Sequence, residues 1–367
     1  MKKVALIGIA GFGRSHLQLL LPLVDAGLVE FSAAVVRTPA KVPEGMEELR
    51  RRGVKIYPTA EEFFAAERGA IDLVCIPAGI DAHEPLTVGA LAAGMNVLLE
   101  KPAAGSVAAV ERMMAAEKAA AGRFVAVAFQ HGYAPEIHFF KRLLCSGRLG
   151  RILGSATMGI WPRGDVYYSR NAWVAKRASH GVPVLDSPIN NAVAHYLNLL
   201  LFLNGATLPA SARATAVSGE LLRARPSIEM FDACDLAYTL DNPPAARVLF
   251  AHCSDQKHEP ELRIVCEKGV IRWHNNADWE ITGEDGAAIA SGMAIAPNAT
   301  MFRVALDRLQ HPETPIYTLA NALEHTRCIE LADQNCPIVP IPATPNADGV
   351  YCAPDIPARF ASRFQQK

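Results

Sequence analysis

Residues 4–13 read Val-Ala-Leu-Ile-Gly-Ile-Ala-Gly-Phe-Gly, and this stretch decides the fold of the first part of the chain. The apolar run over residues 4–7 is typical of a strand that is buried on both faces. A helical pattern over residues 14–26 follows the glycines, with a kink expected at Pro22. A glycine-rich turn between a strand and a helix places free backbone N–H groups where a pyrophosphate binds.

The same strand–helix alternation continues to residue 129. Further strands are predicted at 30–36, 71–76, 96–99 and 124–129, and helices at 84–93 and 106–121. This order predicts an α/β domain over residues 1–129 with a doubly wound parallel sheet.

The pattern changes after residue 130. Helices are predicted at 135–146 and 189–203, followed by β-type runs at 211–220, 235–240, 246–253, 262–267, 270–274 and 279–282. Two late helices, at 299–310 and 319–334, precede a proline-rich tail. We therefore expect an α+β domain with an antiparallel sheet over residues 130–340 and a separate tail over 341–367.

Composition excludes several classes of protein. Hydrophobic residues make up 50% of the chain, charged residues 20%, and the net charge is −1, so no nucleic-acid or membrane partner is expected. No apolar run is long enough to span a bilayer, and the first residues lack a signal-peptide pattern. The eight cysteines form no C-x-x-C pair, which favours reduced thiols in a cytoplasmic protein and predicts no metal site.

The glycine loop and the next strand predict the cofactor. Ala10 replaces the second glycine of G-x-G-x-x-G, but its methyl group is small enough to let a phosphate approach. The second strand ends in Arg37 and Thr38, where an NAD-binding site usually has an acidic residue. These two side chains suit a 2′-phosphate, so NADP is favoured and NAD stays possible. Alternatively, Arg37 stacks on the adenine and the ribose contact comes from elsewhere.

The tripeptide Glu100-Lys101-Pro102 at a strand end makes the resemblance specific. Together with the glycine loop, His83 and residues 141–150, it resembles the Gfo/Idh/MocA family of NAD(P)-dependent oxidoreductases. The resemblance implies a Rossmann domain followed by a domain with a large, open, mostly antiparallel sheet. It also implies hydride transfer at hydroxyl or keto carbons of sugars, cyclitols or related polyols.

The resemblance also implies a catalytic pair. Lys101 would contact the nicotinamide and the substrate hydroxyl, and His195 would exchange the proton. Asn191 takes the place of the family's aspartate, and Asn191, His195 and Asn198 have the spacing of one helical face. The competing interpretations are a surface lysine and a capped helix with a satisfied histidine.

The remaining site residues follow from the same patterns. The expected substrate contacts are Gln130, Arg170, Trp173, Lys176 and Asn198, although Trp173 could simply be packed. The expected cofactor contacts are Gly8, Ala10, Gly11, Phe12, Gly13, Arg14, Arg37, Thr38, Pro77, His83, Glu100 and Lys101.

An apolar sheet face without helices would need a partner. A homodimer or homotetramer is therefore expected through the C-terminal sheet, with Val217, Ala237, Val248 and Ile264 as candidates for that face.

Two other functions stay open. One is a non-catalytic dinucleotide-binding sensor or regulator, which Asn191 would suit. The other is an NAD-assisted glycosidase or lyase, which would show no net cofactor reduction.

Overall fold

The computed structural model describes residues 1–242, 245–294 and 297–365, and its internal contacts divide the chain into two units. The N-terminal unit comprises Met1–Ala104, Ala108–Gln130 and Pro297–Ala322; the C-terminal unit comprises Gly105–Val107, His131–Ala296 and Leu323–Lys367. The segment 297–322 differs from the expected division, because it packs with the N-terminal unit. There the Val127 N–H donates to the Tyr317 carbonyl at 2.8 Å.

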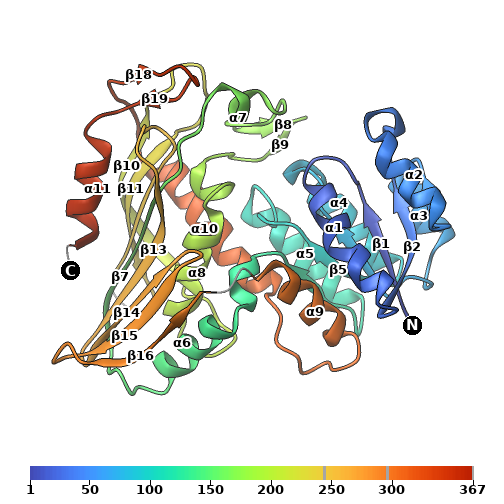
Figure 1. The fold of residues 1–367 in the computed structure, drawn as a ribbon, viewed down its shortest axis with the longest axis horizontal. Coiled ribbons are helices and arrows are strands. Elements are labelled where there is room, and N and C mark those ends of the chain that lie inside the picture. The colour runs from blue at the N-terminus through green and yellow to red at the C-terminus, as the bar shows by residue number, and fades with distance from the viewer. Residues whose placement is uncertain (243–244, 295–296, 366–367) are drawn as a thin grey trace. The chain divides into compact units, whose positions relative to one another are not determined.

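The N-terminal unit is built on a six-stranded parallel sheet in the order β3-β2-β1-β4-β5-β6 (Figure 1). Its elements are β1 (Lys2–Ile7), α1 (Phe12–Asp25), β2 (Val29–Val35), η1 (Pro39–Lys41), α2 (Pro43–Arg51), β3 (Lys55–Tyr57), α3 (Ala60–Ala66), β4 (Leu73–Ile76), α4 (Ile80–Ala92), β5 (Asn96–Leu99), α5 (Val107–Ala119), β6 (Val125–Val127) and α9 (Asn298–Arg308). This strand order confirms the predicted Rossmann sheet. The sequence prediction omitted the short edge strand β3 and the helices that flank it.

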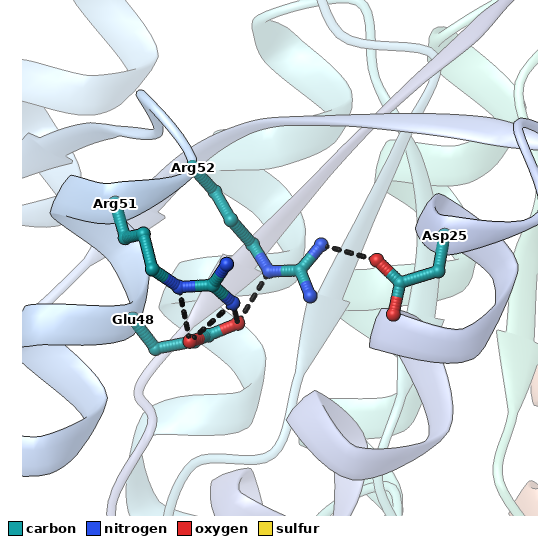
Figure 2. Close-up of polar contacts among 4 residues, drawn as sticks. All are labelled: Asp25, Glu48, Arg51 and Arg52. Atoms are coloured by element: carbon teal, nitrogen blue, oxygen red, sulfur yellow. Dashed lines mark hydrogen bonds and ion pairs between the residues drawn. The ribbon is translucent and has the colours of Figure 1, made fainter.

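Ion pairs fix the far end of the helix that follows the glycine loop. Arg52, just after α2, donates to Asp25 at the end of α1 at 2.7 Å and also to Glu48, which Arg51 contacts as well (Figure 2). These hydrogen bonds hold the pKa of Asp25 and of Glu48 below the usual carboxyl range. The network ties α1 to α2 at the surface of the unit.

The C-terminal unit is built on a nine-stranded sheet in the order β16-β15-β14-β13-β7-β12-β11-β10-β17. Its elements are η2 (Gln130–Tyr133), α6 (Pro135–Cys145), β7 (Ile152–Ile160), α7 (Asp165–Ser169), β8 (Ala178–Ser179), β9 (Val182–Pro183), η3 (Pro188–Asn190), α8 (Ala194–Asn204), β10 (Ala214–Arg223), β11 (Ala233–Leu240), β12 (Ala246–Ala251), β13 (His258–Cys266), β14 (Gly269–His274), β15 (Asp278–Gly283), β16 (Ala288–Met293), α10 (Leu319–Asn335), β17 (Ile338–Pro340), β18 (Thr344–Pro345), β19 (Tyr351–Cys352) and α11 (Ile356–Gln365). The sheet is mostly antiparallel, as expected, with parallel pairs only between β7 and β12 and between β10 and β17 among the strands of the described residues. Strand β7, at the centre of the sheet, was absent from the sequence prediction.

The two faces of this sheet carry different helices. Figure 1 shows α6, α8 and α10 along one face, which we call the helix face, and α11 along the other, the outer face. The segment over residues 341–367, which we expected to form a proline-rich tail, contains β18, β19 and α11 in its described part. Phe360 and Phe364 of α11 pack in one buried cluster with Met158 of β7 and Leu249 of β12. The last turns of the chain therefore complete the core, and only residues 366–367 lie outside the description.

The strand register shows on which face of the sheet each of the four candidate residues lies. Val248 and Ile264 are fully buried, and they lie on the helix face together with Val217, because their cross-strand partners do. Ala237 alone lies on the outer face, beside Arg247. The outer face also carries the Arg272–Glu280 ion pair and a groove of charged side chains beside α11. The outer face of this sheet therefore carries charged side chains and is not the uncovered apolar face that we expected.

All eight cysteines are free thiols, and six of them are buried. Burial raises the pKa of the Cys266 thiol to about 11 and that of Cys234 to about 12, so these thiols stay protonated near neutral pH. Among the described residues, no helix is both long and apolar enough to cross a membrane.

Candidate active site

The glycine loop has the geometry that a dinucleotide pyrophosphate needs. Gly8 and Gly11 adopt φ values of 93° and 54°, which side chains disfavour. A Cβ atom on Gly13 would lie 2.2 Å from the Gly8 carbonyl oxygen, so no larger residue fits there without a backbone shift. Gly13 thus permits the close approach of α1 to the end of β1.

The first turn of α1 leaves backbone N–H donors available to a ligand. No side chain caps this helix and its first turn holds no acid. The N–H groups of Gly13 and Arg14 bond back to the Ala10 and Gly11 carbonyls, whereas those of Gly11 and Phe12 have no partner among the described residues. Ala10, Phe12 and Arg14 are exposed around this end. Free N–H groups and the helix dipole fit a bound pyrophosphate.

Arg37 and Thr38 lie where the sequence predicts contact with the adenosine ribose. Both are exposed directly after β2. In the described part of the chain, Arg37 forms no ion pair, and no acidic residue follows β2 until Glu44. The end of this strand therefore presents a positive charge.

Lys101 is held by its neighbour Glu100, directly after β5. The buried Glu100 carboxylate accepts the Lys101 backbone N–H at 3.0 Å and lies 2.8 Å from Nε2 of His16. His16 is a buried residue of α1, the helix that the glycine loop begins. The Glu100 carboxylate thus links Lys101 to α1, and its predicted contact with the cofactor stays a prediction. Sequence reasoning missed His16, which carries no motif of its own.

His83 braces the same segment from α4. It is 1% exposed, and its Nδ1 and Nε2 lie 2.9 Å from the Pro102 carbonyl and 3.0 Å from the Ala78 carbonyl. Burial lowers the pKa of His83, so its imidazole is neutral near pH 7. Pro77, predicted as a further cofactor contact, is buried beside Gly13. We therefore interpret His83 as a positioning group for the segment that carries half-buried Lys101.

We predicted that Asn191, His195 and Asn198 share one helical face, and this prediction is wrong for Asn191. Helix α8 begins at Ala194, so it contains His195 and Asn198, whereas Asn191 has non-helical dihedrals after η3. Asn191 Nδ2 donates to Asp186 Oδ1 at 2.7 Å, and the other oxygen of Asp186 accepts the Ala175 N–H at 2.6 Å. The Asp186–Asn191 bond replaces the continued helix, because Pro188 starts a separate turn between them.

A second imidazole lies beside His195 in the C-terminal unit. The His131 and His195 ring centroids are 5.5 Å apart in an edge-to-face arrangement, and Trp273 packs edge-on against His131. Burial lowers the pKa of His131 to about 4, so this ring stays neutral. Sequence reasoning did not select His131, although it follows Gln130 where the family resemblance leads one to expect an arginine. Gln130 itself is half-buried at the start of η2.

The predicted substrate residues differ in how available they are. The Arg170 guanidinium lies over the Tyr167 ring, 3.6 Å from its centroid, and 5.7 Å from the Trp173 centroid. Trp173 is half-buried against a small apolar cluster. Lys176 is already paired with Glu229 at 2.9 Å. Asn198 is 1% exposed within α8. Lys176 thus has an acidic partner, whereas Arg170 forms no ion pair among the described residues, and the substrate roles of both stay predictions.

Among the residues that the structure describes, no group of His, Cys, Asp and Glu side chains is arranged to hold a metal ion.

Comparisons with known proteins match the N-terminal part of the sequence and the fold of most of the chain. Residues 2–129 match the GFO_IDH_MocA model, described as an oxidoreductase family with an NAD-binding Rossmann fold. Inositol 2-dehydrogenase from Streptomyces avermitilis is 27% identical over 288 residues, which cover 77% of this chain and 76% of that enzyme.

Solved structures share the two-unit architecture. The WlbA dehydrogenase from Bordetella pertussis, in complex with NADH and UDP-GlcNAcA, has a TM-score of 0.74 at 18% identity, covering 91% of this chain and 96% of that one. The aldose-aldose oxidoreductase from Caulobacter crescentus, complexed with glycerol, has a TM-score of 0.71 at 20% identity, with coverages of 91% and 96%. Residues 2–129 therefore match the NAD-binding Rossmann fold of the GFO_IDH_MocA oxidoreductase family, and the fold of most of the chain is similar to that of the two solved oxidoreductases.

Proposed function

We propose that this oxidoreductase transfers a hydride between a nicotinamide dinucleotide and a hydroxyl or keto carbon of a sugar, cyclitol or related polyol. The observation that carries the proposal is the placement of Lys101. It follows β5, an interior strand of the sheet, and Glu100 ties its backbone to the glycine-loop helix. The carboxyl ends of parallel strands are where such sheets bind ligands. The polyol and sugar names of its relatives support the same substrate class.

Each catalytic role follows from the chemistry of its side chain. The bound dinucleotide supplies the hydride acceptor or donor. The Lys101 ammonium stabilises the negative charge that develops on the substrate oxygen. His195, in the first turn of α8, exchanges the hydroxyl proton. The neutral His131 ring packs against His195 and adds no competing positive charge. Asn191 acts indirectly, since its amide is bound to Asp186 and helps shape the approach to α8.

We further propose NADP as the preferred cofactor, with NAD as the alternative. Exposed Arg37 and Thr38 suit a 2′-phosphate, and no carboxylate at that strand end would repel it. NADPH should bind at least several-fold more tightly than NADH in a direct titration, and Arg37→Ala should remove the difference. Equal affinities in the wild-type protein, or a preference for NADH that survives Arg37→Ala, would contradict this assignment.

The catalytic proposal is tested with Lys101→Ala and His195→Ala. Each should lower turnover of a verified sugar or polyol by about 10²–10⁴-fold while leaving dinucleotide affinity nearly unchanged. The control is Lys176→Ala, because Lys176 is occupied by Glu229. Wild-type rates in both alanine variants would refute the assigned roles.

The alternatives give different outcomes in the same assays. Loss of cofactor binding in Lys101→Ala, without turnover of any substrate by the wild type, would favour a dinucleotide-binding sensor. Conversion of a glycoside without net cofactor reduction would favour an NAD-assisted glycosidase or lyase.

A further inference from the structure

Arg170, a candidate substrate residue, and Arg163 have no acidic partner in the described part of the chain. The Arg163 guanidinium lies 5.1 Å from the Tyr167 ring centroid and 5.5 Å from that of Trp161, and Arg170 lies 3.6 Å from Tyr167. Arg163 donates to the Pro162 carbonyl at 3.5 Å, and Arg170 donates to the Tyr167 carbonyl at 3.3 Å and also bonds the Tyr167 phenol. Two guanidinium groups thus share one aromatic ring without a carboxylate to balance them.

Another arginine of this unit shows the usual arrangement. Arg225 also stacks on aromatic rings, 4.5 Å from the Tyr168 centroid and 4.7 Å from that of Tyr351. Unlike Arg163 and Arg170, it forms an ion pair, with Asp165 at 2.7 Å. Cationic groups that leave water are normally paired in this way, because an unpaired charge loses hydration without compensation. Half-buried Arg163 and exposed Arg170 lack such an acid among the described residues.

Two buried side-chain nitrogen atoms near Tyr167 lack hydrogen-bond partners among the described residues. His252 is 2% exposed, its ring lies 5.4 Å from that of Tyr167, and its carbonyl accepts the Arg163 N–H at 3.0 Å. Neither His252 Nε2 nor Arg163 Nε has a hydrogen-bond partner among the described residues. Burial, and then the two arginines, lower the pKa of His252, so its ring is neutral. Buried polar atoms are rarely left unpaired, and a bound ligand would satisfy them.

Two acids reach this region, and both are already engaged. Glu259 accepts a hydrogen bond from Trp161 Nε1 at 3.2 Å and forms an ion pair with Lys257. Asp186 is close enough to Tyr167 to raise the pKa of its phenol, after the larger effect of burial. Its two carboxylate oxygens accept hydrogen bonds from Asn191 and Ala175. Asp186 therefore connects the arginine pair to the segment before α8, where His195 lies, without neutralising the pair.

We propose that Trp161, Arg163, Tyr167, Arg170 and His252, which we call the arginine cluster, bind an oxyanion carried by the substrate, a carboxylate or a phosphate. This inference rests on the proposed function and narrows its substrate class to acidic sugars or polyols. A guanidinium group binds either anion through paired N–H donors. The Trp161 and Trp173 rings supply apolar surface for the C–H face of a sugar.

The test measures binding with matched probes. D-Glucuronate and D-glucose 6-phosphate are compared with D-glucose by tryptophan fluorescence and calorimetry, in the presence of NAD or NADP. At least one acidic probe should bind about tenfold or more tightly than glucose, since one charge-assisted contact changes an affinity by that order. The stronger of the two identifies the anion. Equal binding of all three probes would overturn the proposal.

Variants then locate the anion site. Arg163→Gln and Arg170→Gln should each remove most of the preference for the acidic probe over glucose. Arg272→Gln is the control, because that arginine pairs with Glu280 on the outer face. Arg170→Lys, which keeps the charge but not the paired donors, should retain part of the preference. Unchanged preference in folded Arg163→Gln and Arg170→Gln, with melting curves like the wild type, would refute the cluster as the site.

Turnover separates this proposal from the function on which it rests. Oxidation of neutral polyols, with no preference for an acid, would leave the proposed function standing and overturn the anion site. Acid binding that depends on both arginines, without reduction of either dinucleotide by any probe, would support the anion site and count against the proposed reaction.

Discussion

Among the described residues, Lys141 is a buried cation with no acidic partner, and its replacement by methionine tests how the C-terminal end of α8 is held. The residue is 1% exposed, and its Nζ donates to the carbonyls of Phe202 at 2.5 Å, Gly205 at 2.6 Å and Ala210 at 3.0 Å. These carbonyls lie at the end of α8 and in the loop that follows, and the Phe202 carbonyl also accepts the Gly205 N–H at 3.2 Å. Lys141→Met keeps the approximate shape and removes all three donors.

The magnitude follows from two opposing effects. Burial lowers the pKa of Lys141 from 10.5 to about 8, which corresponds to about 3 kcal/mol against the ammonium. Each buried carbonyl that loses its donor costs about 1–3 kcal/mol. The Phe202 carbonyl keeps the Gly205 N–H, so the loss falls mainly on the Gly205 and Ala210 carbonyls. We expect Lys141→Met to lower the free energy of unfolding by about 1–3 kcal/mol.

The assay is urea denaturation combined with hydrogen exchange. The amides of residues 205–212 should exchange faster in Lys141→Met than in the wild type, because the carbonyls that hold the loop have lost their donor. Arg142→Met is the matched control, since Arg142 is the next residue of α6 and is exposed. A difference between the two variants below about 0.5 kcal/mol would refute the reasoning, since that is the usual range for surface substitutions.

The pH dependence has a definite sign. The pKa of Lys141 is about 8 in the folded protein and 10.5 when unfolded, so the unfolded chain binds more protons between these values. The stability of the wild type relative to Lys141→Met should therefore increase as the pH rises from about 8 to 10.5. A relative stability that falls over this range would contradict the burial of the ammonium.

Three further predictions follow from the described contacts. Gly13→Ala should abolish dinucleotide binding, measured by titration, because the new Cβ would lie 2.2 Å from the Gly8 oxygen; wild-type affinity would show that the loop adapts. Asn191→Asp should destabilise the protein, because the new carboxylate would face Asp186 Oδ1, which lies 2.7 Å from the present amide nitrogen. The loss of thermal stability relative to the wild type should be larger at pH 8 than at pH 5. A loss that does not depend on pH would exclude this repulsion. Self-association through the C-terminal sheet stays a prediction, now through a charged outer face, so light scattering at micromolar concentration should give a dimer or tetramer that weakens with added salt; a monomer would contradict it.

The sequence by itself determined the elements whose signals are local. The run over residues 4–13 predicts β1, the loop and α1, because a buried strand, a glycine turn and an amphipathic helix each follow from adjacent residues. The alternation up to β6 predicts the parallel sheet for the same reason. Lys101 could be selected from its position after a strand and from the family resemblance, although its role stays a proposal.

Only the tertiary structure decided the contacts between distant segments. His16 and Glu100 are 84 residues apart, and Lys141 and Ala210 are 69 apart, so nothing local to either partner indicates the pair. Asn191 was placed on the wrong element because its spacing from His195 is helical, while its hydrogen bond to Asp186 outweighs that tendency. The unpaired arginines appear only once their surroundings are known, because the absence of an acidic neighbour is a property of the fold. Sequence periodicity predicts which face of a helix or strand a residue lies on. Whether a charged side chain there has a partner depends on which residues the fold places beside that face.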